Sequence, residues 1–187
     1  MARVIYYAAA TLDGYIADAD DGLDWLTKYE GGYGGEDAQP MKGSYDEFYE
    51  GIGALVMGST TYEWVLEHVD DWAYAGKPTW VLSSRELAMP TGVSEGEVTA
   101  TRGGVAEIHD DVVAAAGEGD VWVVGGGNVA SQYVDAGLLD ELVVTVVPVV
   151  LGEGKPLFDG GLDGPMQLIG ASPWDTGMVE LRYQIRR

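Results

Sequence analysis

Three consecutive glycines stand between an apolar run, residues 121–124, and a segment of helix-forming character that begins at Asn128. A strand that meets a helix through a turn without side chains leaves backbone N–H groups bare at the positive end of the helix dipole, which suits a phosphate group. A purely structural turn explains one or two glycines, so three in a row favour close approach of a ligand to the backbone. The predicted contacts at this junction are Gly125, Gly126, Gly127, Asn128 and Val129.

A second junction of the same kind lies earlier in the chain. The apolar run 54–57 ends in a glycine, and a helix can begin at the residue after it. Two phosphate-binding turns in one small domain suggest a pyrophosphate, and hence a dinucleotide. The predicted contacts here are Gly58, Ser59, Thr60 and Thr61.

A third polar cluster, Ser83, Ser84 and Arg85, directly follows a strand predicted over 79–82. Ligands of parallel sheets gather beyond the carboxyl ends of the strands, and two hydroxyls with a guanidinium can hold a phosphate there. The whole chain has only 10 Lys and Arg residues, so an Arg in this place is significant. We predict that this cluster binds the 2′-phosphate of NADPH; an ordinary polar loop with a surface Arg is the alternative.

Other ligand classes are not supported by the sequence. The triple glycine does not match the G-x-G-x-x-G fingerprint, and the lysine of a P-loop is missing, so neither a standard Rossmann domain nor an NTPase is indicated. Cys is absent, the two His residues stand alone, and the aspartates between residues 18 and 24 do not have the spacing of a calcium loop. We therefore predict no metal site.

The pattern of apolar residues predicts alternating strands and helices. Strands are expected over 3–10, 54–57, 79–82, 97–101, 121–124, 141–147, 166–171 and 178–185, and helices over 45–52, 60–67, 105–116 and 128–136. Ser44 and Glu47 fit a capping box for the first helix, and the glycine-rich segment 11–43 is expected to be a long loop that acts as a lid. This order argues an α/β sandwich with a mostly parallel sheet and an antiparallel pair of strands at the C-terminal end.

Composition and charge narrow the class further. With 187 residues and 47% hydrophobic content, the chain is expected to fold as one domain, 1–187. The net charge of −21 and the lack of a basic footprint argue against nucleic acid as a partner. Without a signal-peptide pattern or an apolar run of membrane-spanning length, we expect a cytoplasmic protein that does not associate with membranes.

Five segments follow one another in a recognisable order: residues 12–17, 55–62, 81–85, 124–129 and 148–158. Together they resemble the dihydrofolate reductase superfamily, and most closely the branch related to the C-terminal reductase domain of the bifunctional riboflavin-biosynthesis deaminase-reductase. The resemblance spans nearly the whole chain. Each motif is weak alone, but five in register are specific.

The resemblance implies a three-layer sandwich around a mixed, mostly parallel sheet, and an NADPH-dependent reductase that forms a homodimer. By it, the two glycine junctions contact the cofactor phosphates, residues 83–85 hold the adenosine end, and the segment after the first strand lines the nicotinamide and substrate side. The implied substrate-side residues are Asp13, Gly14, Tyr15 and Ile16. Trp25, in the long loop, either caps the substrate pocket or anchors the loop.

Two positions bear on how far the resemblance extends. Ser59 stands where the family often carries an Arg, so one phosphate contact is lost or supplied elsewhere. Dihydrofolate reductases bind the pterin through a carboxylate on the helix before this junction, and Asp46 lies on a similar predicted helix. Asp46 is therefore the candidate catalytic residue, although a first-turn charge that complements the helix dipole explains it equally. Either Asp46 or an ordered water is the candidate proton donor.

Three function classes follow from these residues. The first is a reductase that transfers hydride from NADPH to a small heterocyclic or a ribityl- or ribosyl-aminopyrimidine substrate. A phosphorylated substrate would need cationic contacts beyond those of the cofactor, and Lys155 is one of the few available. The alternative is a non-catalytic nucleotide-binding protein of the same fold, which would bind NADPH without turnover. The third class is a structural or interaction domain in which the glycines serve only as turns, and which would bind no nucleotide.

The scattered acidic residues also suggest a salt-rich source, because salt would screen their mutual repulsion. We expect the fold to gain stability between dilute buffer and molar salt, measured as the midpoint of thermal unfolding. An unchanged or lower midpoint in molar salt would argue against this hypothesis.

Overall fold

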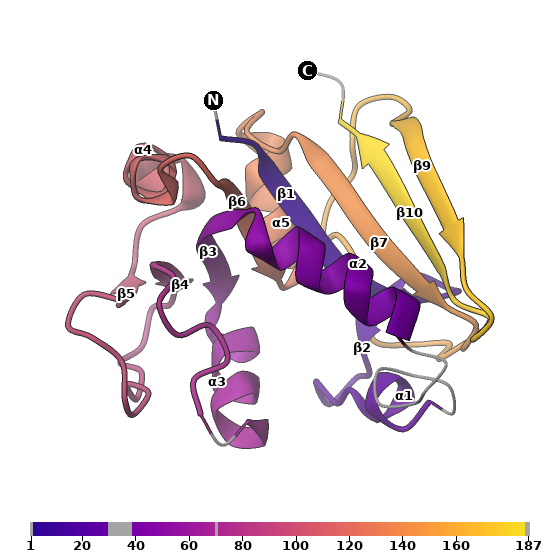
Figure 1. Ribbon diagram of the computed structural model, residues 1–187, viewed down its shortest axis with the longest axis horizontal. Helices are drawn as coiled ribbons and strands as arrows, with labels where there is room; N and C mark the ends of the chain where they lie inside the picture. Colours follow the sequence, from indigo (N-terminus) through magenta and orange to yellow (C-terminus); the bar gives the residue numbers. More distant parts are fainter. Residues whose placement is uncertain (1, 30–38, 70, 186–187) are drawn as a thin grey trace.

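The computed structural model describes residues 2–29, 39–69 and 71–185. Within them, eight strands form one sheet in the order β5-β4-β3-β6-β1-β7-β10-β9 (Figure 1). The strands are β1 (Val4–Thr11), β3 (Ile52–Gly58), β4 (Thr79–Leu82), β5 (Val98–Thr101), β6 (Asp120–Gly125), β7 (Glu141–Val147), β9 (Gln167–Pro173) and β10 (Val179–Gln184). Neighbours from β5 to β7 are parallel, whereas β10 is antiparallel to β7 and β9. The predicted mixed, mostly parallel sheet is thus confirmed.

Helices cover both faces of this sheet. They are α1 (Asp24–Thr27), α2 (Gln39–Glu50), α3 (Ser59–His68), α4 (Val105–Ala116) and α5 (Gly127–Asp135). None of the helices in the described part of the chain has the length and apolar character that a membrane span requires.

Side chains alternate between the two faces of the sheet, because successive residues of a strand point to opposite sides. On β1, Tyr6 shares a buried cluster with side chains of α4 and α5, while Tyr7 shares another with side chains of α2 and α3. Figure 1 shows α2 in front of the sheet and α5 behind it. The structure therefore has the three layers that the family resemblance implied.

Helix α2 begins earlier than predicted. The capping box is wrong, since Ser44 lies inside the helix, several residues after its start at Gln39. The Ser44 hydroxyl donates instead to Oε2 of Glu180, at 3.4 Å. The sequence pattern missed the first turn because Gly43 and Ser44 are poor helix formers. Pro40 is tolerated because the first turn of a helix needs no backbone N–H at that position.

A second, two-stranded sheet joins β2 (Tyr15–Ala17) to β8 (Lys155–Pro156). Both β2 and the short helix α1 lie in the segment 11–43, for which a loop was predicted. Strands of two or three residues are too short to show a period of two in the sequence. Their pairing brings the segment after β7 beside the segment after β1.

Gly53 allows α4 to lie close against β3. A Cβ atom added at Gly53 would collide with the backbone carbonyl of Ala116, the last residue of α4. We expect Gly53→Ala to lower the free energy of unfolding by about 1–3 kcal/mol, the usual effect of overpacking, because two backbone segments would have to separate. Urea denaturation of the purified variant measures this loss.

Gly51→Ala is the matched control. There the added Cβ would lie 3.4 Å from the carbonyl oxygen of Phe48, which is an ordinary contact. Its unfolding midpoint should stay close to that of the unchanged protein. Equal losses in the two variants would count against the packing argument.

Candidate functional site

A cavity of about 920 Å³ lies beyond the carboxyl ends of the parallel strands. Its wall includes Gly58 at the end of β3, Leu82 at the end of β4 and Gly125 at the end of β6. Ligands of open parallel sheets bind at this edge, and the volume is typical of small-molecule sites. The cavity is therefore the candidate functional site.

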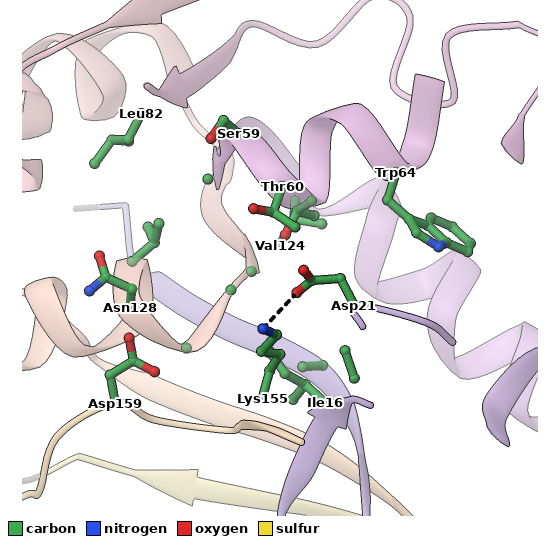
Figure 2. Close-up of a pocket in the computed structure, with 18 of the residues that line it drawn as sticks. Ile16, Asp21, Ser59, Thr60, Trp64, Leu82, Val124, Asn128, Lys155 and Asp159 are labelled. Atoms are coloured by element: carbon green, nitrogen blue, oxygen red, sulfur yellow. Dashed lines mark ion pairs between the residues drawn. The ribbon is translucent and has the colours of Figure 1, made fainter. Parts of the chain in front are cut away.

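The predicted cofactor contacts meet in this cavity, although they come from three distant parts of the sequence. The wall contains Gly58, Ser59, Thr60, Thr61, Ser83, Ser84, Gly125, Gly126, Gly127, Asn128 and Val129. Figure 2 shows Ser59 and Thr60 across the cavity from Asn128. Of the predicted set, Arg85 alone is not part of the wall.

Two helices begin at the cavity wall with their N-termini free of side-chain caps. α3 begins at Ser59 and α5 at Gly127, and no side chain caps either helix. The first N–H groups of a helix have no partner within it, and the helix dipole adds positive potential there. The two junctions thus offer two anion-binding positions in one cavity, as a pyrophosphate requires.

The three consecutive glycines are needed for three different reasons. Gly125 has a φ of 149°, a conformation that side chains rarely allow. A Cβ at Gly127 would collide with the carbonyl of Pro156 on β8. A Cβ at Gly126 would meet, among the described atoms within 4 Å, only Cδ1 of Ile16 at 3.9 Å. Gly126 therefore leaves room for a ligand, whereas the fold itself requires the other two.

A third helix start at the cavity was not predicted. Arg102, Gly103 and Gly104 follow β5, precede α4 and line the wall. In the described part of the chain the Arg102 side chain has no hydrogen-bond or ion-pair partner. The other described cationic side chains are engaged: Arg3, Lys28, Arg85, Lys155 and Arg182 pair with carboxylates, and Lys77 donates to a backbone carbonyl. The sequence Arg102-Gly103-Gly104 between a strand and a helix repeats the pattern of the two glycine junctions. This repetition is the signal by which the third helix start could have been predicted.

Arg85, the predicted phosphate ligand, is paired with a carboxylate instead. Its Nη2 atom lies 2.7 Å from Oε2 of Glu63 on α3 and 3.3 Å from Oγ of Ser59. The Ser83 hydroxyl closes a turn over residues 83–85, since it donates to the carbonyl of Arg85 and accepts from the N–H of Arg85. The sequence could not show this pairing, because Glu63 stands 22 residues before Arg85.

The predicted substrate-side residues divide between the cavity and the scaffold. Ile16 lines the cavity, whereas Asp13, Gly14, Tyr15 and Trp25 do not. Trp25 packs against the buried cluster that holds Met178. Of its two predicted roles, the structure therefore supports the one in which Trp25 anchors the loop.

Asp46, the predicted catalytic residue, is exposed on α2 and lies outside the cavity wall. Its neighbour Tyr45 is part of that wall. Adjacent residues of a helix project about 100° apart, so a helix that turns one of them to the cavity turns the next one away. The sequence did not fix the rotation of α2, which decides between these two side chains.

Asp13 connects the end of β1 to the segment after β7. Its Oδ1 atom accepts from the Thr11 hydroxyl at 2.6 Å and the Leu151 N–H at 3.2 Å, and Oδ2 accepts from the Gly152 N–H at 2.7 Å. These bonds, that of Thr11 most of all, hold the pKa of Asp13 below its ordinary value. The carboxylate thereby fastens the segment that leads to β8, which lines the cavity.

Four aromatic side chains, which we call the aromatic wall, line one part of the cavity: Tyr7, Tyr45, Tyr74 and Trp122. The centroid of the Trp122 ring lies 6.5, 5.9 and 5.6 Å from those of Tyr7, Tyr45 and Tyr74. No sequence pattern indicated this group, because its members come from four separate segments and single aromatic residues fit an ordinary core equally well.

The aromatic wall is uncharged. The Tyr7 hydroxyl donates to Oε2 of Glu180 at 2.9 Å, and Nε1 of Trp122 donates to the Tyr7 carbonyl at 3.1 Å. Burial raises the pKa of Tyr74 well above its ordinary value, so this phenol stays protonated at neutral pH. The cavity therefore meets ring surface here.

Charged side chains of the cavity wall are few and balanced. Among the described residues, Asp21 and Asp159 stand against Arg102 and Lys155. Nζ of Lys155 lies 3.6 Å from Oδ1 of Asp21, an ion pair between β8 and the segment before α1 (Figure 2). The described residues contain no group of three or more His, Asp or Glu side chains that could hold a metal ion.

The fold is that of a dihydrofolate reductase-like protein. The structure of dihydrofolate reductase from Enterococcus faecalis, complexed with NADP(H) and RAB-propyl, is similar with a TM-score of 0.64. The similarity covers 99% of this chain and 97% of that chain at 18% identity, which shows a shared fold.

Within that class, the chain belongs to the RibD C-terminal domain family, whose model matches residues 2–179. YwjB of Bacillus subtilis is 30% identical over 156 residues, which cover 83% of this chain and 82% of that protein. A crystal structure of a protein from Shewanella sp. PV-4, assigned to riboflavin biosynthesis, is similar over the whole of both chains, with 31% identity and a TM-score of 0.79. The predicted family resemblance is thus confirmed.

The bonds to Asp13 predict how it titrates. Because its pKa is lowered in the folded protein, the stabilisation it provides is present above the unfolded pKa and is lost as the pH falls through the folded pKa. Carboxyl carbon NMR should show Asp13 titrating below its ordinary value of 3.8, and Thr11→Val should raise its pKa toward that value. Thr27→Val, on α1, is the control and should leave the Asp13 titration unchanged. A pKa at or above 3.8 in the unchanged protein would contradict the structural role.

Proposed function

We propose that this protein is an NADPH-dependent reductase that transfers hydride to a small heterocyclic substrate. The observation that carries the proposal is the meeting of three helix starts at one cavity, two of them uncapped and the third beside the unpaired Arg102. Membership of the RibD C-terminal domain family and the dihydrofolate reductase-like fold support it.

The glycine junctions fit the pyrophosphate of a dinucleotide. Backbone N–H groups at the starts of α3 and α5 would donate to its oxygens, and the hydroxyls of Thr60 and Thr61 lie in the same wall. The space beside Gly126, where Cδ1 of Ile16 lies 3.9 Å from an added Cβ, leaves room for a phosphate to approach the backbone.

Arg102 fits the 2′-phosphate that distinguishes NADPH from NADH. Arg102 is exposed and lines the cavity, and its guanidinium has no partner among the described residues, unlike that of Arg85, which is paired with Glu63. Arginine recognises a phosphate through two parallel hydrogen bonds. An unpaired arginine can form them without first breaking an ion pair with a carboxylate. We therefore transfer the predicted 2′-phosphate contact from Arg85 to Arg102.

When bound, NADPH supplies the hydride, and the chain contributes binding, orientation and exclusion of water. The described parts of the segment 11–43 serve this purpose, because Ile16 on β2, Leu23 before α1 and Leu26 on α1 all line the cavity. Apolar side chains in the wall of a hydride-transfer site displace solvent from the reacting atoms. We accordingly retain the predicted lid role for this segment.

A nucleotide-binding protein without catalysis is the second candidate function. The exposure of Asp46 favours it, because the predicted proton donor lies outside the cavity wall. Oxidation of NADPH, followed by the loss of its absorbance with a panel of pterins, pyrimidines and aldehydes, separates the two. Tight NADPH binding with no turnover of any compound would support the second function.

Arg102→Ala should weaken NADPH binding about 10- to 100-fold, because a charge-assisted hydrogen bond contributes about 1.5–3 kcal/mol and each 1.4 kcal/mol is tenfold in affinity. NADH affinity should change little, since NADH lacks the 2′-phosphate. Titration of tryptophan fluorescence with each dinucleotide measures both.

Arg85→Ala provides the matched control for this experiment. It removes an arginine that is paired with Glu63 outside the cavity wall, so NADPH affinity should fall less than threefold. A larger loss for Arg85→Ala than for Arg102→Ala would restore the original assignment. Equal losses of NADPH and NADH affinity in Arg102→Ala would show that Arg102 does not bind the 2′-phosphate.

A further inference from the structure

The cavity extends from the glycine junctions onto the face of the sheet that α2 and α3 cover. Tyr7, Tyr74 and Trp122 belong to the buried cluster on this face, and Tyr45 packs against that cluster from α2. On β6, Trp122 precedes Gly125 by three residues, which is about 10 Å of strand. The aromatic wall therefore bounds a second, deeper part of the cavity.

This deeper part is lined by rings held in a fixed arrangement: Tyr45 is half-buried, whereas Tyr7, Tyr74 and Trp122 lie behind it at 7, 8 and 6% exposure. The rings of Tyr45 and Tyr74 stand edge to face against Trp122, at interplanar angles of 73° and 88°. The hydroxyl of Tyr7 and the Nε1 atom of Trp122 are already bonded within the protein. Flat ring systems stack on such surfaces whatever their pattern of polar substituents.

Unpaired positive charge is absent from the aromatic wall as the structure describes it. Arg102 stands at the start of α4, which packs on the other face of the sheet. Lys155 lies 3.6 Å from Asp21, so its charge is already compensated. Among the described residues, a phosphate group placed against the aromatic wall would lose water without gaining a counter-charge, and burial of an unpaired anion is strongly unfavourable.

We infer that the substrate is a planar, uncharged heterocycle that carries no phosphate group and stacks on the aromatic wall. This inference rests on the reductase function proposed above and deepens it, because it separates two substrate classes that the sequence left open. A ribosyl-aminopyrimidine phosphate falls in the excluded class. The selectivity comes from the chain's own residues, since a neutral ring needs only stacking whereas a phosphate needs a free cation.

Two matched pairs of probes test the inference: uridine with uridine 5′-phosphate, and riboflavin with riboflavin 5′-phosphate. Each is titrated into the protein saturated with NADP⁺, so that the phosphate-binding junctions are already filled, and binding is followed by quenching of tryptophan fluorescence. We expect the neutral member of at least one pair to bind, and to bind at least tenfold more tightly than its phosphate. The inference is overturned if the phosphorylated member binds as tightly, or if no probe binds.

Salt separates local selectivity from the repulsion that a net charge of −21 exerts on any anion. In molar salt the Debye length is about 3 Å, so long-range repulsion is screened. A preference for the neutral probe that persists there comes from the aromatic wall. A preference that disappears in molar salt would contradict the inference.

Tyr45→Leu tests the wall directly. Tyr45 is half-buried, so its replacement is compatible with folding, which a thermal unfolding midpoint checks. The variant should bind the neutral probe at least tenfold more weakly with unchanged NADPH affinity. Tyr183→Leu is the control and should leave probe binding unchanged, because Tyr183 is also half-buried but lies outside the cavity wall and packs against the cluster on the other face of the sheet.

Failure of the inference is distinguishable from failure of the proposed function. Loss of the reductase proposal would appear as no binding of NADPH to the unchanged protein. If NADPH binds and the phosphorylated probe is preferred, only the inference fails. Lys155→Ala would then abolish that preference if Lys155 leaves Asp21 to receive the phosphate.

Discussion

Parallel hydrogen bonding between β3 and β6, with Met57 opposite Gly125, is the constraint on which the cavity depends. Two strands that run the same way end at the same edge, and each must be followed by a crossover before the next strand can pair. Here the crossover begins at once with a helix, α3 after β3 and α5 after β6. The N-termini of α3 and α5 therefore face the same cavity from opposite faces of the sheet. β4 and β5 continue this edge of the sheet, and α4 begins at the cavity after β5.

Close backbone packing then ties the site to the fold. The absence of a Cβ at Gly127 lets the Pro156 carbonyl lie against the start of α5, and the carboxylate of Asp13 fastens the segment that leads to Pro156. The strand β8 is thereby held over the cavity and places Lys155 in its wall. Asp13, which was predicted to lie on the substrate side, is therefore outside the cavity wall and fixes the segment that leads to it.

Much of this could be predicted from the sequence, because strands and helices of ordinary length carry their own periodicity. The strand 79–82, the helix 105–116 and the strand 141–147 lie where the pattern put them, and the glycine junctions meet as expected. What could not be predicted depends on rotation or on pairing between distant residues. The rotation of α2 places Tyr45, and not Asp46, in the cavity wall. Arg85 is paired with Glu63 and lies outside that wall. Strands as short as β2 and β8 carry no periodic pattern in the sequence.

Charge explains why so few side chains are left to recognise a ligand. With a net charge of −21, almost any cation of this chain finds a carboxylate nearby, and those described do so apart from Lys77 and Arg102. The field of such a protein would repel the anionic cofactor that we propose, so binding of that cofactor would depend on short-range donors that carboxylates do not neutralise. Backbone N–H groups at helix starts are donors of that kind, because they are fixed by the fold and have no side chain to pair. The aromatic wall follows the same logic for a neutral ligand, since stacking needs no charge at all. A strongly acidic protein can therefore bind one anion and one flat ring in a single cavity with only one free guanidinium among its described residues.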